Sequence, residues 1–257
     1  MKKILVLVFA AVILAAPRAQ AQDSMMFNHM GLGVTLGVDG VGLDLAMPLG
    51  HTVQLRAGYG IDVYGSLIPV TTTLNLGTIE GHNFNNIDAS AKVWGSGTGH
   101  LFADFYPGKG GFHISAGLFV NNGKLVSATA DLSKALSSED WARTSVNGIS
   151  TDLNGQLYVD VKHWNVMPYL GLGFGRAINP EKTFNFVFDM GLMVWGSPEV
   201  QSRKYTMASN YQEYETVAVT PQTLGLNEGD QAAKLLNLIS EIPVCPYIRF
   251  GFYFKLF

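Results

Sequence analysis

The chain ends in Tyr247-Ile248-Arg249-Phe250-Gly251-Phe252-Tyr253-Phe254-Lys255-Leu256-Phe257, and this stretch decides the fold. Side chains of an extended strand alternate between two faces. One face of this strand is apolar and carries Ile248, Phe250, Phe252, Phe254 and Leu256, while the other carries Arg249, Gly251, Tyr253 and Lys255. A soluble sandwich would bury the apolar face in a core, whereas a membrane-spanning barrel would turn it to lipid and keep the polar face inside.

The amino-terminal segment 1–21 is typical of a cleaved secretory signal. Lys2 and Lys3 precede an apolar run over residues 4–16, and Ala19-Gln20-Ala21 forms a small-x-small cleavage site. The apolar run is too short to cross a bilayer as a helix. We therefore expect an exported mature chain, residues 22–257, that forms a single domain.

The composition excludes several classes of protein. Hydrophobic residues make up 47% of the 257 residues, yet no apolar run after the signal approaches the length of a transmembrane helix. A chain that spans a membrane without such helices must form a closed barrel. The only cysteine, Cys245, excludes an internal disulfide framework, and a net charge of −3 offers no basic footprint for nucleic acid.

Eight segments alternate in the way that a barrel strand requires. An Asp39-Gly40 turn follows the first, residues 95–99 bend the fourth, and the sixth changes parity between His163 and Asn165, which predicts a β-bulge. The segments are 30–38, 41–49, 52–65, 87–105, 112–120, 153–174, 184–194 and 247–257. The sequence therefore predicts an all-β fold, an eight-stranded transmembrane up-and-down antiparallel barrel.

The lengths of the connections predict how the barrel sits in the membrane. Three connections are long, 66–86, 131–150 and 201–243, and tight turns alternate with them. Bacterial barrels have short periplasmic turns and longer outer loops. We therefore expect these three loops outside the cell, with a short helix over 227–241 in the last of them.

The stretches that match a known family are Gly111–Leu118, Met167–Gly175, Phe188–Leu192 and Gly196–Val200. In them the chain resembles the family of CarO-type ornithine-uptake porins, which are small outer-membrane proteins. The resemblance covers roughly the carboxy-terminal two thirds of the chain. It implies an eight-stranded barrel in the bacterial outer membrane and a narrow uptake channel for small polar or basic solutes.

The terminal aromatic strand also resembles the signal by which bacterial barrel proteins reach their assembly machinery, although Phe257 is out of phase with the apolar series. We therefore expect the assembly machinery as a partner, together with outer-membrane lipid and lipopolysaccharide. The barrel is expected to be a monomer.

The inward-facing positions carry many of the chain's charges. Two readings remain open: paired charges that plug a narrow interior, or a polar lumen in which Asp104 and Asp189 favour cationic solutes. The candidate lumen residues are Asp44, Arg56, Asp62, Asp88, Lys92, Asp104, Asp160, Lys162, Asp189, Arg249 and Lys255. A plugged barrel would serve as a structural component or as a surface-binding protein.

An enzyme is the rival class. His113-Ile114-Ser115 has the His-x-Ser spacing of lipid A deacylases, in which one strand face holds both groups of a nucleophilic pair. Here the pair lies beside a predicted periplasmic turn, on the opposite side of the membrane from the acyl chains of that substrate. We therefore expect no catalytic activity. The six histidines and the lone cysteine show no metal-ligand spacing, and no glycine-rich loop suits a phosphate, so no metal or cofactor is expected.

Overall fold

A computed structural model describes residues 29–61, 70–74, 78–79, 82–83, 85–93, 97–134, 149–205, 213–223, 234, 237–238 and 240–256. The expected signal segment 1–21, Asp62 and Phe257 lie outside these residues. Within the described ranges, no helix has the length and apolar character needed to cross a bilayer.

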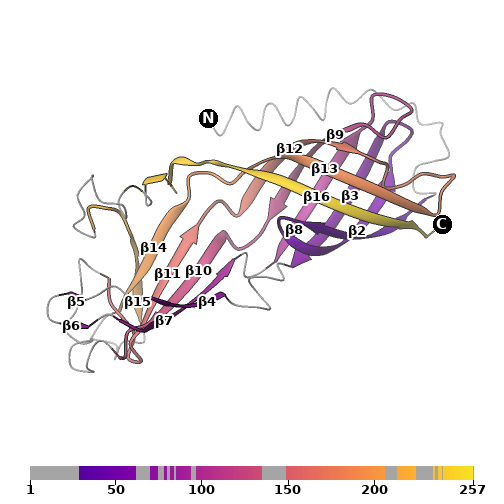
Figure 1. Ribbon diagram of the computed structural model, residues 1–257. Coiled ribbons are helices and arrows are strands. Elements are labelled where there is room, and N and C mark those ends of the chain that lie inside the picture. The colour runs from indigo at the N-terminus through magenta and orange to yellow at the C-terminus, as the bar shows by residue number, and fades with distance from the viewer. Residues whose placement is uncertain are drawn as a thin grey trace.

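Eight antiparallel strands close into a barrel, as predicted (Figure 1). Each strand pairs with the next barrel strand along the chain, and the first pairs with the last, from Gly31 opposite Lys255 to Gly37 opposite Arg249. The strands are β1 (Gly31–Gly37), β2 (Gly40–Pro48), β3 (Val53–Ile61), β8 (Thr98–Phe105), β9 (His113–Val120), β12 (Val166–Phe174), β13 (Phe184–Val194) and β16 (Val244–Lys255).

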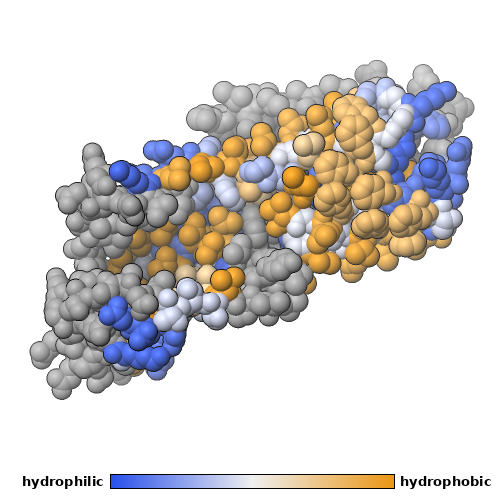
Figure 2. Space-filling model, in the orientation of Figure 1, coloured by the Kyte–Doolittle hydropathy of each residue, from blue (hydrophilic) through white to orange (hydrophobic). Residues whose placement is uncertain are grey.

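The outer wall of the barrel is apolar, and its residues follow the predicted parity. Figure 2 shows hydrophobic residues over the barrel wall and hydrophilic residues at the end that holds the carboxyl terminus. Leu170 is 63% exposed, and phenylalanine rings pack against one another across β13 and β16, with the Phe186 and Phe252 centroids 5.3 Å apart. A closed antiparallel barrel with an apolar outer wall is the architecture of outer-membrane β-barrel proteins.

Three of the four turns between neighbouring barrel strands lie at the end of the barrel that holds the last residues of β16. They span residues 49–52, 106–112 and 175–183. At the other end, the β1–β2 hairpin turns at Val38-Asp39 and not at the predicted Asp39-Gly40. Gly40 pairs with Gly37 and is therefore the first residue of β2. Its positive φ of 98° belongs to this first strand position and not to the turn itself.

The three long connections between barrel strands form a second sheet, which combines segments predicted as loops with the outer parts of two predicted strands. This sheet is open, with the order β15-β14-β11-β10-β7-β4, and it extends beyond the end of the barrel away from the carboxyl terminus (Figure 1). Its strands are β4 (Val70–Leu74), β7 (Ile87–Val93), β10 (Lys124–Asp131), β11 (Gln156–Lys162), β14 (Glu199–Tyr205) and β15 (Tyr214–Ala218). The short pair β5 (Thr78–Ile79) and β6 (His82–Asn83) stands apart.

Two predicted strands are therefore divided between the sheets. Segment 87–105 forms β7 and β8, and segment 153–174 forms β11 and β12. The parity change at residues 163–165 is where the chain passes from one sheet to the other, and the predicted β-bulge is wrong. Backbone bonds from His163 N to Gly123 O (2.9 Å) and from Asn121 N to Asn165 O (3.0 Å) hold the two crossing segments together.

The expected helix over 227–241 falls mostly outside the described residues. Helical geometry is described only at Lys234, at 237–238 and at 240–241. The helix stays a prediction.

Candidate functional site

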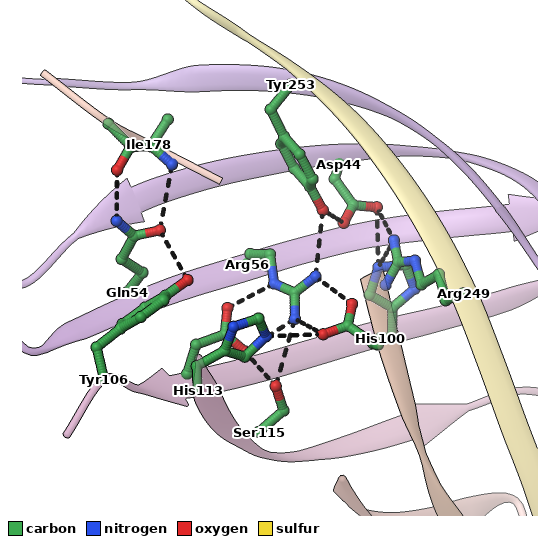
Figure 3. A network of polar contacts seen from close by, with 12 residues as sticks. Asp44, Gln54, Arg56, His100, Tyr106, His113, Ser115, Ile178, Arg249 and Tyr253 are labelled. Carbon is green, nitrogen blue, oxygen red and sulfur yellow. Dashed lines mark hydrogen bonds and ion pairs between the residues drawn. The ribbon is translucent and has the colours of Figure 1, made fainter. Parts of the chain in front are cut away.

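The interior of the barrel is built around Arg56 of β3. Its guanidinium donates to both oxygens of Asp104, at 2.6 and 2.8 Å, and to both oxygens of Asp189, at 2.7 and 2.9 Å (Figure 3). All three side chains are buried. The planar guanidinium suits this arrangement because it presents pairs of parallel N–H donors to a carboxylate. One cation thus holds β3, β8 and β13 together through two buried carboxylates.

A second charge pair lies beside the first. Arg249 of β16 donates through Nη2 to Asp44 of β2, and His100 Nε2 lies 3.0 Å from the same carboxylate oxygen. The Tyr253 hydroxyl donates to Asp44 at 2.7 Å and lies 3.5 Å from Nη1 of Arg56, which links the two pairs. Nε and Nη1 of Arg249 have no hydrogen-bond partner within the described part of the chain.

An aromatic layer separates the charges from the second sheet. Phe119 is its centre, with ring centroids 5.2 Å from Phe102, 5.7 Å from Tyr169 and 4.8 Å from Tyr247. Met167 and Met193 complete the buried cluster. This layer fills the barrel at the end where the long connections leave it.

The opposite end is closed by the β12–β13 turn, which folds under the barrel. Gln54 holds this turn through two hydrogen bonds with the backbone of Ile178, at 2.6 and 3.2 Å. Arg176 stacks 4.1 Å from the Tyr106 ring and donates to the carbonyls of His51, Gly108 and Gly110 at 2.9 to 3.1 Å. Two neighbouring turns are therefore tied to the β12–β13 turn.

Where β1 pairs with β16, the interior side chains of the two strands differ in size. The interior positions of β1 are Gly31, Gly33, Thr35 and Gly37, and the Tyr253 ring occupies the volume beside Gly33. A Cβ at residue 33 would lie 2.4 Å from that ring. The large interior side chains at the seam thus come from β16.

The structure brings five of the candidate lumen residues into one network. These are Asp44, Arg56, Asp104, Asp189 and Arg249. Asp88 and Lys92 belong to β7, and Asp160 and Lys162 belong to β11, so all four lie on the second sheet. Lys255 lies at the rim, where its ammonium donates to Pro180 O at 2.6 Å. Asp62 is outside the described residues.

Several members of the interior network were not among the sequence candidates. They are Gln54, His100, Tyr106, Arg176 and Tyr253. The inward parity of their strands would have found Gln54, His100 and Tyr253, because these share a face with Arg56, Asp104 and Arg249. Arg176 follows a strand, and no periodicity marks it.

His113 and Ser115 contact different carboxylates and are fully buried. His113 Nε2 lies 2.9 Å from Asp189 and its Nδ1 lies 3.1 Å from Gly111 O, while the Ser115 hydroxyl donates to Asp104 at 2.6 Å. Neither ring nitrogen is left to accept the Ser115 proton, which nucleophilic activation requires. The pair therefore supports the network.

The same carboxylates raise the question of a metal. Ligand atoms of Asp104, His113 and Asp189 all lie within 4.8 Å of one another. However, the Arg56 guanidinium already contacts all four carboxylate oxygens. A metal ion would have to displace it, so the donor set does not fit a resident ion.

The second sheet has one polar and one apolar face. Cross-strand register places Thr71, Ser90, Thr129 and Tyr158 side by side on the polar face. The opposite face carries small apolar residues, including Ala89, Ala91, Ala128 and Val159. Two hollows lie on the polar face, one of about 440 Å³ over β4, β7, β10 and β11, and one of about 170 Å³ over β10, β11, β14 and β15.

Comparisons with known proteins find similar solved structures. CarO of Acinetobacter baumannii is 18% identical with a TM-score of 0.45, covering 87% of this chain and 96% of that one. CarO2 of Acinetobacter baumannii is 17% identical with a TM-score of 0.46, covering 88% and 98%. A major outer membrane protein of Thermus thermophilus is 10% identical with a TM-score of 0.42, covering 89% and 98%. No protein-family model and no curated protein matches the sequence.

Proposed function

We propose that this outer-membrane β-barrel is a non-conducting, non-catalytic membrane anchor that presents its second sheet outside the cell as a binding surface. The observation that carries the proposal is the filled interior, in which Arg56 and its two carboxylates lie between an aromatic layer and a folded-in turn. An eight-stranded barrel is just wide enough for side chains to fill. The expected partners are outer-membrane lipid, lipopolysaccharide and the assembly machinery, which would recognise β16. The barrel is expected to be a monomer.

The alternative is a narrow channel for small polar or cationic solutes. Such a channel needs carboxylates that remain available to a passing cation. Asp104 and Asp189 are each already paired with Arg56 through two contacts, and Asp44 is paired with Arg249. A solute would have to break these buried ion pairs and displace the Phe119 cluster, and either step is costly. The geometry therefore favours the anchor.

The second sheet supports the binding role. Its polar face carries threonine, serine, glutamine and tyrosine side chains around two hollows, at the end of the barrel opposite the tight turns. Long outer extensions with tight turns at the other end indicate that this sheet faces the cell exterior.

Single-channel conductance of the refolded mature protein in planar bilayers tests the closed interior. We expect no steady current steps, with or without basic amino acids, in protein whose heat-modifiable gel mobility shows that it is folded. Cation-selective steps that weaken in an Asp104→Asn, Asp189→Asn double variant would overturn the proposal in favour of a channel.

Cysteine labelling on whole cells tests the presentation of the sheet. In a Cys245→Ser background, Thr216→Cys on β15 should react with a membrane-impermeant maleimide on intact cells. Lys109→Cys, in a tight turn at the other end, should react only after the outer membrane is permeabilised. The reverse pattern would place the sheet in the periplasm and contradict the proposed role.

A further inference from the structure

The smaller hollow of the second sheet gathers positive charge. Strand pairing puts Lys124 directly opposite Lys162, and Arg203 of β14 is the third cation. The complete lining is Lys124, Tyr158, Asp160, Lys162, Gln201, Ser202, Arg203, Tyr214 and Thr216. Like charges directly opposite each other destabilise a strand pair. An anion bound near these cations would relieve the repulsion that neighbouring carboxylates leave uncompensated.

The neighbouring carboxylates leave two of these cations without an ion pair. Asp160 accepts from Lys124 at 2.9 Å and from Ser127 at 2.7 Å. Burial acts to raise the pKa of Asp160, but these hydrogen bonds and the nearby charges of Lys124 and Arg203 together hold the pKa below its usual value, so Asp160 stays ionised near neutral pH. Glu199 pairs in register with Lys162, yet its Oε2 accepts from Gln201 at 3.2 Å. In the described ranges, no ion pair involves Lys162 or Arg203.

Arg203 is held in place by aromatic rings. Its guanidinium carbon lies 4.1 Å from the Tyr158 ring centroid and 4.5 Å from that of Tyr214, and Nη1 donates to the Tyr205 hydroxyl at 3.2 Å. Contact with two rings and one hydroxyl restricts the guanidinium and leaves other N–H donors for a ligand. A cation fixed in this way loses little side-chain entropy when it binds a carboxylate or a phosphate.

Two further features indicate a ligand that carries hydroxyl groups. Gln201 Oε1 is buried and has no hydrogen-bond partner among the described atoms. It can accept a hydrogen bond from a hydroxyl group, which a simple anion lacks. Tyr214 is 47% exposed and presents an aromatic face next to the cations. An amide acceptor, a threonine hydroxyl and an exposed ring suit the hydroxyls and the apolar face of a sugar.

We propose that this pocket binds an acidic saccharide, with its carboxylate or phosphate group at Lys162 and Arg203 and its hydroxyls at Gln201 and Thr216. The inference rests on the proposed role of the second sheet as a binding surface and names the ligand class. Such a group is available from a free acidic oligosaccharide or from the saccharide of lipopolysaccharide in the same membrane. The chemistry of the contact is the same in both.

Titration calorimetry of the full-length barrel in phospholipid nanodiscs tests the proposal, with trigalacturonate as the probe. We expect measurable binding that weakens roughly a hundredfold or more in a Lys162→Gln, Arg203→Gln double variant, because both charged contacts to the ligand are lost. Gln201→Ala should weaken binding less. The matched control Lys109→Gln, Lys182→Gln removes two exposed lysines at the tight-turn end and should bind like the unaltered protein.

Three outcomes would overturn the assignment. Equal binding of inorganic phosphate would make the pocket a simple anion site, and equal binding of neutral maltotriose would remove the role of the charges. Equal loss in the control pair would show attraction to net charge alone. If the double variant fails the gel-mobility test for folding, the single Lys162→Gln variant carries the test, because Lys162 contacts no aromatic ring among the residues that the structure describes.

A second arm distinguishes the two sources. In nanodiscs that contain lipopolysaccharide, a weaker apparent affinity for trigalacturonate that depends on Lys162 would assign the pocket to that lipid, whereas an unchanged affinity would assign it to free saccharide. The conductance and labelling experiments do not depend on the ligand test. The anchor role and the saccharide pocket can therefore be refuted independently of each other.

Discussion

Replacing Arg56 with methionine should destabilise the barrel more than any other single change in the interior network. The methionine keeps much of the apolar volume but removes the one cation shared by Asp104 and Asp189. Both carboxylates are buried, and each loses two contacts of 2.6 to 2.9 Å. Breaking one buried ion pair by removing a partner costs about 3–5 kcal/mol. Here a single change leaves two carboxylates unpaired, so the loss should lie at or above the upper end of that range.

The assay is equilibrium urea unfolding of the refolded barrel in lipid vesicles, followed by tryptophan fluorescence and by gel mobility. Asp104→Asn and Asp189→Asn should each cost less than Arg56→Met, because Arg56 keeps its other carboxylate in either variant. The triple variant Arg56→Met, Asp104→Leu, Asp189→Leu removes every charge of this pair of bridges. Exchange of buried ion pairs for apolar residues is often neutral or stabilising, so the triple variant should recover part of the loss, with the recovery limited because His113 and Ser115 lose their carboxylate partners.

Two results would refute this reasoning. A loss below about 1 kcal/mol for Arg56→Met would mean that water reaches the two carboxylates, since solvated ion pairs contribute about that much. A triple variant as unstable as Arg56→Met would mean that packing around the guanidinium, and not charge pairing, stabilises this layer.

Three further predictions concern other parts of the chain. Arg176→Ala should lower the free energy of unfolding by about 1–3 kcal/mol because three carbonyls lose a charged donor, and Arg176→Lys should restore only part of it in the same urea assay. Gly33→Ala should cost about 1–3 kcal/mol through collision with the Tyr253 ring, whereas Gly108→Ala, where a Cβ would meet nothing within 4 Å, should unfold like the unaltered protein. Burial lowers the pKa of His163 below its usual 6.5, so the folded state holds this ring neutral and stability should fall as pH drops below about 6.5. The pH slope of the urea midpoint should flatten in His163→Gln, and an unchanged slope would assign it to another group.

The barrel strands could be predicted from the sequence because each has one face in lipid. Val53 to Ile61 alternates apolar and polar residues with period two, and the structure forms β3 over the same residues. Segment 87–105 keeps one parity throughout, although its first part belongs to the second sheet. Alternation reports which face is apolar and does not report which strand lies alongside, so the division into two sheets could not be predicted.

The same limit applies to the interior network. Arg56 lies 48 residues from Asp104 and 133 residues from Asp189 along the chain, and Arg249 lies 205 residues from Asp44. Parity predicted that these side chains point inward. Their pairing depends on the register of several strand pairs and on the closure between β1 and β16, which no local pattern encodes.

The small residues of β1 have a consequence for the order in which the barrel is completed. No interior side chain of β1 is larger than Thr35, and Tyr253 of β16 already fills the space beside Gly33. The other strands can therefore bring their charges and rings together before the last seam is made. β1 can then join by backbone hydrogen bonds alone, with no bulky group to pass through a crowded interior. Pairing of β1 with β16 can therefore be the last step of barrel formation.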